Sequence, residues 1–287
     1  YIYEEKCAGD NKVITHDIFT NGNGYATLYF DFENVPKEYL PYIGLLTNIL
    51  GYMNTDKHSY TDLASIININ TGGIVSSVTV IHDYVDYKKY RMFAKVKAKA
   101  LYENMPVAFD LMKELIIDTD YSDEARMLEL LNMIKSRMQP SILSAGHSTA
   151  FKRAMSYISE ADACQDKLGG LDFDRMLCDL IDNYDEKKAE LTDTLNKVAR
   201  MIFRKENMIV DYIGEGKAHD AVLPLTEKIA GQLFTEEASL PDSGFELKKL
   251  NEGFKTGAKV QYVARVGNFK DEGLDYVGKL SDLKVIM

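Results

Sequence analysis

The segment from residue 20 to residue 73 constrains the fold of this chain most strongly. Within it, Tyr25–Phe32 alternates apolar side chains with polar or tyrosine side chains, and this period of two is typical of a half-buried strand. An apolar helical run follows and ends at Gly51, and Ser59 is placed to cap a second helix. Another strand begins at Ile74. The segment therefore predicts the order strand, helix, helix, strand.

The first of these two helices carries a proline near its start. Pro41 in a helix interior would remove a backbone hydrogen bond, so we expect the helix to begin near Leu40 with the proline in its first turn. One face of this helix is apolar and consists of Tyr42, Leu45, Leu46, Ile49 and Leu50. This stripe predicts that the helix packs against the core.

Strands and helices continue to about residue 234. The expected strands are Val13–Phe19, the hairpin pair Ile74–Ile81 and Tyr90–Ala98, and Asn207–Ile213. The expected helices are Met105–Ile116, Asp123–Met138, Leu171–Ile181, Asp185–Phe203 and a run around Val222–Leu233. Strands that occur early and late, with helices between them, predict an α+β fold. Its sheet is expected to be mostly antiparallel and covered by helices on one face.

Two of these elements carry more specific expectations. We expect Ser122 to cap the helix Asp123–Met138 and Pro140 to end it. The strand Tyr90–Ala98 has a basic face formed by Arg91, Lys95 and Lys97 together with Phe93. The alternation predicts a solvated sheet face there rather than a binding patch.

The chain is expected to divide into three parts. Residues 1–234 form the main domain, residues 235–256 lack periodicity and read as a linker, and residues 257–287 open a further, truncated domain. In the last part, Lys259–Val266 is predicted to be a strand and Leu274–Met287 a helix. We expect this part to fold back onto the main domain or to pair with another copy. The first residue is Tyr1 rather than Met, so a piece of a longer protein or a processed form is expected.

Composition limits the classes of protein to be considered. A hydrophobic content of 46% supports a sizeable core, and a net charge of −10 argues against a nucleic-acid partner. No apolar run approaches the roughly 18 residues of a membrane span, so no membrane partner is expected. Cys7, Cys164 and Cys178 show no metal-site or disulfide spacing, which is typical of reduced cysteines in a cytoplasmic protein.

The first helix also carries a resemblance to a known family. The chain resembles the pitrilysin/insulinase superfamily of zinc metallopeptidases, and within it the presequence-protease branch. Active domains of that family carry His-x-x-Glu-His on the helix after the first strand. Here Leu40-Pro41 occupies the lead-in, and Tyr42, Leu45 and Leu46 occupy the His, Glu and His positions. None of these three side chains is a zinc ligand or a general base, so the resemblance implies a domain without catalytic residues and without a metal site.

A second stretch supports the same resemblance. Residues 144–157 are similar to a Gly-His-x-x-Ala segment of the presequence-protease domain, with His147 near a helix start. No catalytic role is assigned to His147, and His16, in a predicted strand, is read as a structural histidine. The five histidines are scattered and show no i, i+3 or i+4 spacing to one another, which argues against an independent enzyme of unrelated chemistry. The glycines at positions 214 and 216 form only a weak phosphate-loop signal.

The resemblance implies a function for the chain as part of a larger enzyme. Proteins of this branch consist of four homologous α+β domains, of the LuxS/processing-peptidase type, in two halves that close around unfolded peptides. By order of motifs, this chain corresponds to the non-catalytic third domain and the start of the fourth. The implied partners are the N-terminal catalytic half of the same polypeptide and peptide substrates. Zinc is expected in that half and no cofactor in this chain, and the substrate-contacting residues are unknown.

One alternative remains open. Inactive relatives of the same superfamily also serve as free-standing scaffold or assembly subunits. The two hypotheses differ in the flanking coding sequence, since only a fragment of a peptidase requires an upstream His-x-x-Glu-His segment in the same reading frame.

Overall fold

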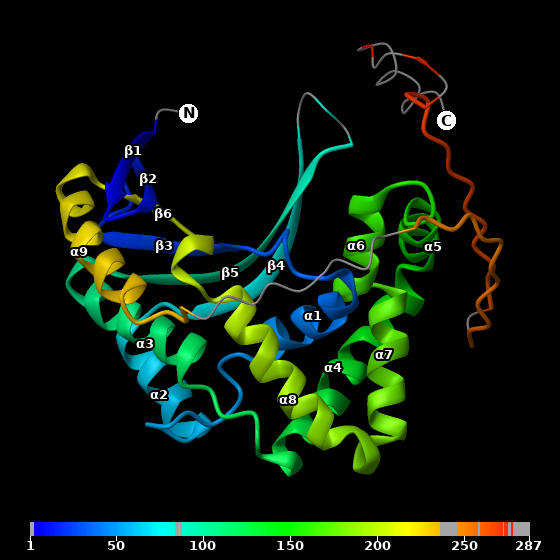
Figure 1. Ribbon diagram of the computed structural model, residues 1–287, viewed down its shortest axis with the longest axis horizontal. Coiled ribbons are helices and arrows are strands. Elements are labelled where there is room, and N and C mark those ends of the chain that lie inside the picture. The colour runs from blue at the N-terminus through cyan, green and yellow to red at the C-terminus, as the bar shows by residue number, and fades with distance from the viewer. Residues whose placement is uncertain are drawn as a thin grey trace.

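A single sheet organises the structure, a computed structural model that describes residues 3–83, 86, 88–235, 246–257, 259–271, 273, 274 and 277 (Figure 1). Its strands are β1 (Glu4–Ala8), β2 (Asn11–Asp17), β3 (Asn23–Asp31), β4 (Ile74–His82), β5 (Tyr90–Leu101) and β6 (Met208–Gly214). The six strands lie in the order β1-β2-β6-β3-β5-β4. All neighbours are antiparallel except β2 and β6, which run parallel with Lys12 opposite Ile209. The mostly antiparallel sheet predicted from the sequence is confirmed.

Helices account for the long connections between the strands. They are α1 (Leu40–Ile49), α2 (Tyr60–Asn70), α3 (Met105–Ile117), α4 (Glu124–Ser144), α5 (Gly146–Met155), α6 (Glu160–Gly169), α7 (Leu171–Asp182), α8 (Tyr184–Ile202) and α9 (His219–Ala230). Pro41 lies in the first turn of α1, and the Ser59 hydroxyl accepts a hydrogen bond from the Asp62 amide at the start of α2, both as the sequence predicts.

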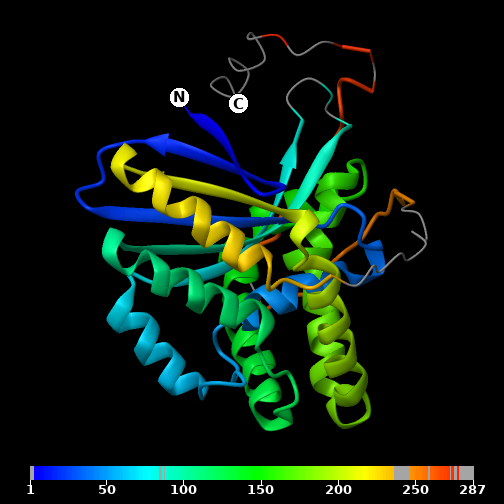
Figure 2. The ribbon, with the colours of Figure 1, turned by 60° about the vertical axis from the view of Figure 1, so that its left-hand side comes forward.

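One face of the sheet is covered and forms the core. The side chains of Ala26, Leu28 and Phe30 on β3 are fully buried, whereas Tyr25 and Tyr29 between them are only partly buried. Helix α9 packs against β1, β2 and β6, and α3 packs against β5 and against α9. Figure 2 shows α9 in yellow running along the sheet. The α+β fold with helices on one face is therefore confirmed.

Helices α1 and α4 to α8 form a second layer beside strand β4, whereas α2 packs against α3. Helix α1 contacts β4 and also α6, α7 and α8, and α4 to α7 lie on the right of Figure 1 with α8 nearer the centre. A Cβ atom at Gly44 would lie 2.0 Å from the carbonyl oxygen of Leu168, so α1 and α6 meet at backbone contact distance. Any larger residue at position 44 would force these two helices apart.

The structure corrects two expectations about α4. Its N-cap is Asp123, whose carboxylate accepts from the Arg126 amide, and not Ser122. Pro140 does not end the helix, which continues to Ser144. The proline removes one hydrogen bond and displaces the carbonyl of Ser136. Both residues are exposed, so water can bind that carbonyl and the helix continues.

The structure also corrects the strand expected at Lys259–Val266. The described residues of this segment form no strand, because no described strand lies beside them to accept their hydrogen bonds. Instead the segment lies against α5, where an added Cβ at Gly146 would be 2.5 Å from the ring of Tyr262. The helix expected at Leu274–Met287 lies almost wholly outside the described residues. The three-part division of the chain remains a prediction.

Within the described part of the chain, no helix is both long enough and apolar enough to span a membrane. The three cysteines form no disulfide. One strand, β1, was not expected from the sequence at all, since its five residues EEKCA show no apolar alternation.

Candidate functional site

The helix that would carry the metallopeptidase motif is filled with apolar side chains. Leu45 and Leu46 are both 0% exposed and belong to the core, and Tyr42 is partly buried beside it. Burial, with a smaller contribution from the nearby Glu190 carboxylate, raises the pKa of the Tyr42 phenol. These three positions offer packing and one neutral hydroxyl. They provide no set of ligands for a metal ion.

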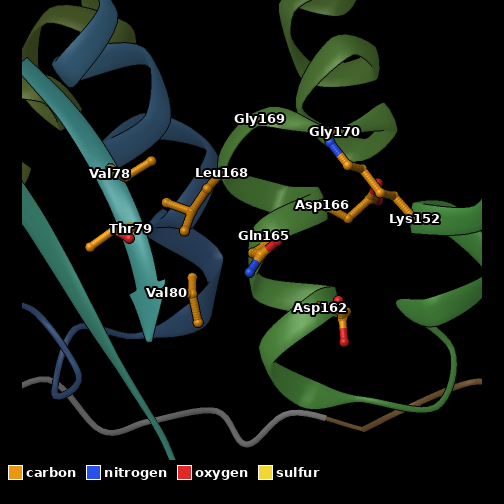
Figure 3. A pocket seen from close by; sticks show the side chains of 10 residues that line it. All are labelled: Val78, Thr79, Val80, Lys152, Asp162, Gln165, Asp166, Leu168, Gly169 and Gly170. Carbon is orange, nitrogen blue, oxygen red and sulfur yellow. The ribbon is translucent and has the colours of Figure 1, made fainter. Parts of the chain in front are cut away.

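A cavity opens close to this helix, between strand β4 and helix α6 (Figure 3). Its volume is about 310 Å³. It is lined by Val78, Thr79 and Val80 of β4, by Lys152 of α5, by Asp162, Gln165, Asp166, Leu168 and Gly169 of α6, and by Gly170. In Figure 3, Val78 and Val80 point across the gap towards Leu168 and Gln165. The cavity therefore has an apolar centre and a polar rim.

Strand β4 is an edge strand, so one of its sides has no strand neighbour in the described part of the chain. The Lys99 amide donates to the Gly73 carbonyl at one end of the β4–β5 pair, and the Asp83 amide donates to the Lys89 carbonyl at the other. Gly73 and Asp83, the residues that flank β4 in the sequence, are both odd-numbered, and both bonds join them to the β5 side of the pair. Antiparallel pairing alternates, so the even-numbered residues direct their backbone groups away from β5. Among these are Val78 and Val80, which line the cavity.

The polar side chains around the cavity differ in whether they have hydrogen-bond partners. Asp166 is 5% exposed, and its carboxylate accepts from the Arg153 guanidinium at 2.5 Å and from the Leu171 amide at 3.0 Å. The side chains of Lys152, Asp162 and Gln165 form no hydrogen bond with another described residue. These three side chains are available to a ligand, whereas Asp166 is already occupied.

A comparison with protein-family models identifies the family of the chain. The model that matches describes the region associated with peptidases of family M16, subfamily C, and it covers residues 2–180, which include α1, β4, α6 and every residue of the cavity. The chain belongs to this M16-associated family. The match extends over more than half of the 287 residues and supports the resemblance to the non-catalytic, C-terminal region of M16 peptidases.

Relatives of this M16-associated chain are considerably longer proteins. It is 32% identical to Protein HypA of Clostridium perfringens over 99% of its own length and 29% of the relative. It is 26% identical to Presequence protease 1, chloroplastic/mitochondrial, of Arabidopsis thaliana over 93% of its own length and 25% of the relative. The chain thus spans between a quarter and a third of the length of these two proteins.

A solved structure supports the fold of this M16-associated chain. The peptidase M16 inactive domain from Pseudomonas fluorescens superposes with a TM-score of 0.53 at 13% identity, covering 85% of this chain and 53% of that one. At this level of identity the likeness concerns the fold alone. It agrees with the α+β sheet and helix layer described above.

The histidines singled out in the sequence lie apart from the cavity of the M16-associated chain. His147 sits at the start of α5 with its ring 6.0 Å from the ring of Tyr262. His16 lies on β2 with its Nε2 atom 2.9 Å from the Asp211 carboxylate. The amide of Gly216 donates to the carboxylate of Asp17 at 2.8 Å, and this negative charge opposes a phosphate there. None of these residues joins the candidate site.

The cavity residues themselves were not found from the sequence. Helix α6, which carries Gln165 and Asp162, was not among the expected helices, although Ser159 caps it by accepting from the Asp162 amide. The edge position of β4 depends on the order of strands in the sheet, and no local signal reports that order. A capping serine at Ser159 is the sequence signal that could have revealed helix α6.

Zinc binding provides a direct check on the motif positions. We expect this chain, stripped with a chelator and then incubated with zinc, to retain less than one ion per molecule and to hydrolyse no peptide. The described residues contain no group of three or more His, Cys, Asp or Glu side chains placed to hold a metal ion. Metal analysis after dialysis gives the measurement. One tightly held zinc per chain together with peptide hydrolysis would contradict the expectation.

A buried arginine connects the wall of the cavity to the segment after residue 245. Arg153 on α5 is 7% exposed and pairs with Asp166, with Asp172 at 2.9 Å and with Glu252 at 2.8 Å. Burial opposes the charge of Arg153, but these three carboxylates outweigh it and raise its pKa above the ordinary value. The bond from Arg153 is the largest cause that lowers the pKa of Glu252, to about 2. The Arg153 cluster thus holds Glu252 against α5 and α7.

The lowered pKa of Glu252 predicts a pH-dependent contribution to stability. A carboxyl group with a lowered pKa in the folded state stabilises the fold above its unfolded pKa of about 4.5, and this contribution disappears as the pH falls towards 2. We expect Glu252→Gln to lower the free energy of unfolding by about 1–2 kcal/mol at pH 7, a value kept small by solvent screening, and the difference from wild type to vanish near pH 2. Denaturant titrations from pH 7 to pH 2 measure it. A difference that stays constant across this range would show that the pair is not formed.

Proposed function

We propose that this chain is a non-catalytic part of a presequence-protease-like zinc metallopeptidase and helps to bind and enclose peptide substrates. Hydrolysis would take place in another part of the same polypeptide. Membership of the M16-associated family and the much greater length of the relatives named presequence protease support this proposal. The apolar residues at Tyr42, Leu45 and Leu46 support the absence of chemistry in this part.

The observation that carries the proposal is the free edge of β4 beside the cavity. An extended peptide can add to an exposed strand edge by main-chain hydrogen bonds, while pockets receive its alternate side chains. The outward backbone groups of Val78 and Val80 supply the hydrogen bonds, and the cavity of about 310 Å³ supplies such a pocket. Leu168 would contact an apolar side chain there, and Gln165 or Lys152 a polar one. This mode of binding requires an unfolded substrate and little sequence specificity.

A proline substitution at an outward-facing position of β4 tests this binding mode. Val78→Pro removes an amide that points away from β5, so the β4–β5 pairing survives while the peptide loses a hydrogen bond and meets the proline ring. We expect this variant to bind a fluorescein-labelled unstructured peptide about 10-fold more weakly than wild type, as measured by fluorescence anisotropy.

The matched control is His82→Pro, which makes the same change at an outward position outside the cavity lining. Its affinity for the peptide is expected to stay within about 2-fold of wild type. Thermal unfolding of both variants shows whether the sheet is intact. Equal affinities of the two folded variants would remove β4 as the binding edge.

A further inference from the structure

The uncovered face of the sheet carries a row of lysines along β5. Lys95, Lys97 and Lys99 stand at alternate positions, so all three point to the face opposite the helices. Lys97 and Lys99 are exposed and Lys95 is half-buried. Alternate residues of a strand are roughly 6.8 Å apart along the backbone, so the three lysines start from evenly spaced positions on this face. We call these three residues the lysine row.

The lysine row differs from the other basic side chains described on the same face. Lys12 pairs with Glu5 at 2.9 Å, His16 with Asp211 at 2.9 Å, and Arg91 with Asp31. In contrast, no described carboxylate forms an ion pair with any of the three lysines of the row. On this face the Asp31 carboxylate of β3 is engaged with Arg91 and the Asp211 carboxylate of β6 with His16, and Asp211 also attracts Lys97 without forming an ion pair with it.

Aromatic and apolar side chains flank the lysine row. The ammonium groups of Lys97 and Lys99 lie 5.7 Å and 5.5 Å from the ring centre of Tyr25 on β3. On the other side, Val75 of β4 lies opposite Lys97 and is 62% exposed. Two of the three cations therefore lie close to an aromatic ring, with an exposed apolar side chain on their other side.

We propose that the lysine row is a docking surface for an acidic polypeptide segment in an extended conformation. Side chains on one side of an extended segment repeat at the same spacing of roughly 6.8 Å, so carboxylates at alternate positions can meet successive lysines. Each carboxylate finds a cation that is not already paired with a described carboxylate, and the methylene groups of the same acidic side chains can contact Tyr25 and Val75, since the residues between them point away from the sheet. Charge complementarity selects the acidic partner and favours its approach.

A protein segment fits this surface better than a nucleic acid does. The row contains three cations within a chain of net charge −10, and a polyanion as long as a nucleic acid would be repelled by the acidic remainder of the surface. A short acidic segment experiences mainly the local charge, because interactions beyond about 10 Å are screened at moderate salt. The proposal is independent of the proposed function, since the row lies on the open face of the sheet and the cavity lies at its edge.

The test compares two labelled peptides and two triple variants. The first peptide alternates Glu and Thr, and the second replaces each Glu by Gln. Lys95→Gln, Lys97→Gln and Lys99→Gln are combined in one variant. The control combines Lys187→Gln, Lys188→Gln and Lys228→Gln, three lysines that form ion pairs elsewhere, and so makes the same change in net charge. Thermal unfolding verifies that both variants are folded.

We expect the Glu-containing peptide to bind wild type and the control variant with affinities within about 2-fold of each other, and the lysine-row variant at least about 10-fold more weakly. Binding of this peptide should also weaken as salt is raised, and the Gln-containing peptide should not bind. An equal loss in both variants would overturn the proposal, and so would equal binding of the two peptides. Tighter binding of single-stranded DNA than of the acidic peptide would overturn it in favour of a nucleic acid. Val78→Pro should leave the acidic peptide's affinity unchanged, which separates this surface from the cavity.

Discussion

Replacing Arg153 by alanine is expected to lower the free energy of unfolding by about 3–5 kcal/mol. The variant leaves the Asp166 carboxylate, which is 5% exposed, without the cation that neutralises it, and an unpaired buried charge is costly. Chemical denaturation at pH 7 provides the measurement.

Two further variants separate this explanation from a loss of packing. Arg175→Ala removes an arginine that contacts Asp172 and Glu252 but is 52% exposed in its side chain, so it should cost less than about 1 kcal/mol. Combining Arg153→Met with Asp166→Asn removes both charges and should recover part of the lost stability. If Arg153→Ala costs no more than Arg175→Ala, the ion pairs of the Arg153 cluster do not stabilise the fold.

Leu46→Ala is expected to destabilise the chain by about 2–5 kcal/mol, the range of large-to-small changes in a packed core. The side chain of Leu46 is 0% exposed, and the predicted register of the resemblance aligns it with a motif histidine. The matched control is Ile69→Ala on α2, whose side chain is 79% exposed and whose truncation should cost less than about 0.5 kcal/mol. Denaturant unfolding of the two variants compares a core position with a surface position. Equal costs would mean that α1 does not pack as described.

Local signals in the sequence were sufficient for most of the elements. Pro41 restricts where α1 begins, the Ser59 side chain caps α2, and the alternation in Tyr25–Phe32 distinguishes the buried from the open face of β3. Each of these signals acts within a few residues, and the observed helices and strand agree with the predictions made from them. The burial of Leu45 and Leu46 on α1 also followed from the apolar stripe of that helix.

Features that depend on distant neighbours could not be predicted in this way. The alternation in Lys259–Val266 is typical of a strand, but a strand also requires a partner, and the segment packs against α5 instead. Strand β1 has no apolar alternation and forms by pairing with β2. The candidate site also depends on distant neighbours. It requires that β4 is at the edge of the sheet, and that contact between α1 and α6 brings Leu168 next to β4.

The position of β6 has a consequence for how the chain folds during synthesis. Strand β6 lies between β2 and β3, although well over half of the 287 residues separate it from them in the sequence. At about 5–20 residues per second, a ribosome completes β6 on the order of 10–40 s after β2 and β3. During this interval β2 and β3 each present an open edge towards the position that β6 will occupy, and such edges invite pairing with other chains. Nascent chains of this protein should therefore depend on chaperones until Met208–Gly214 has emerged from the ribosome.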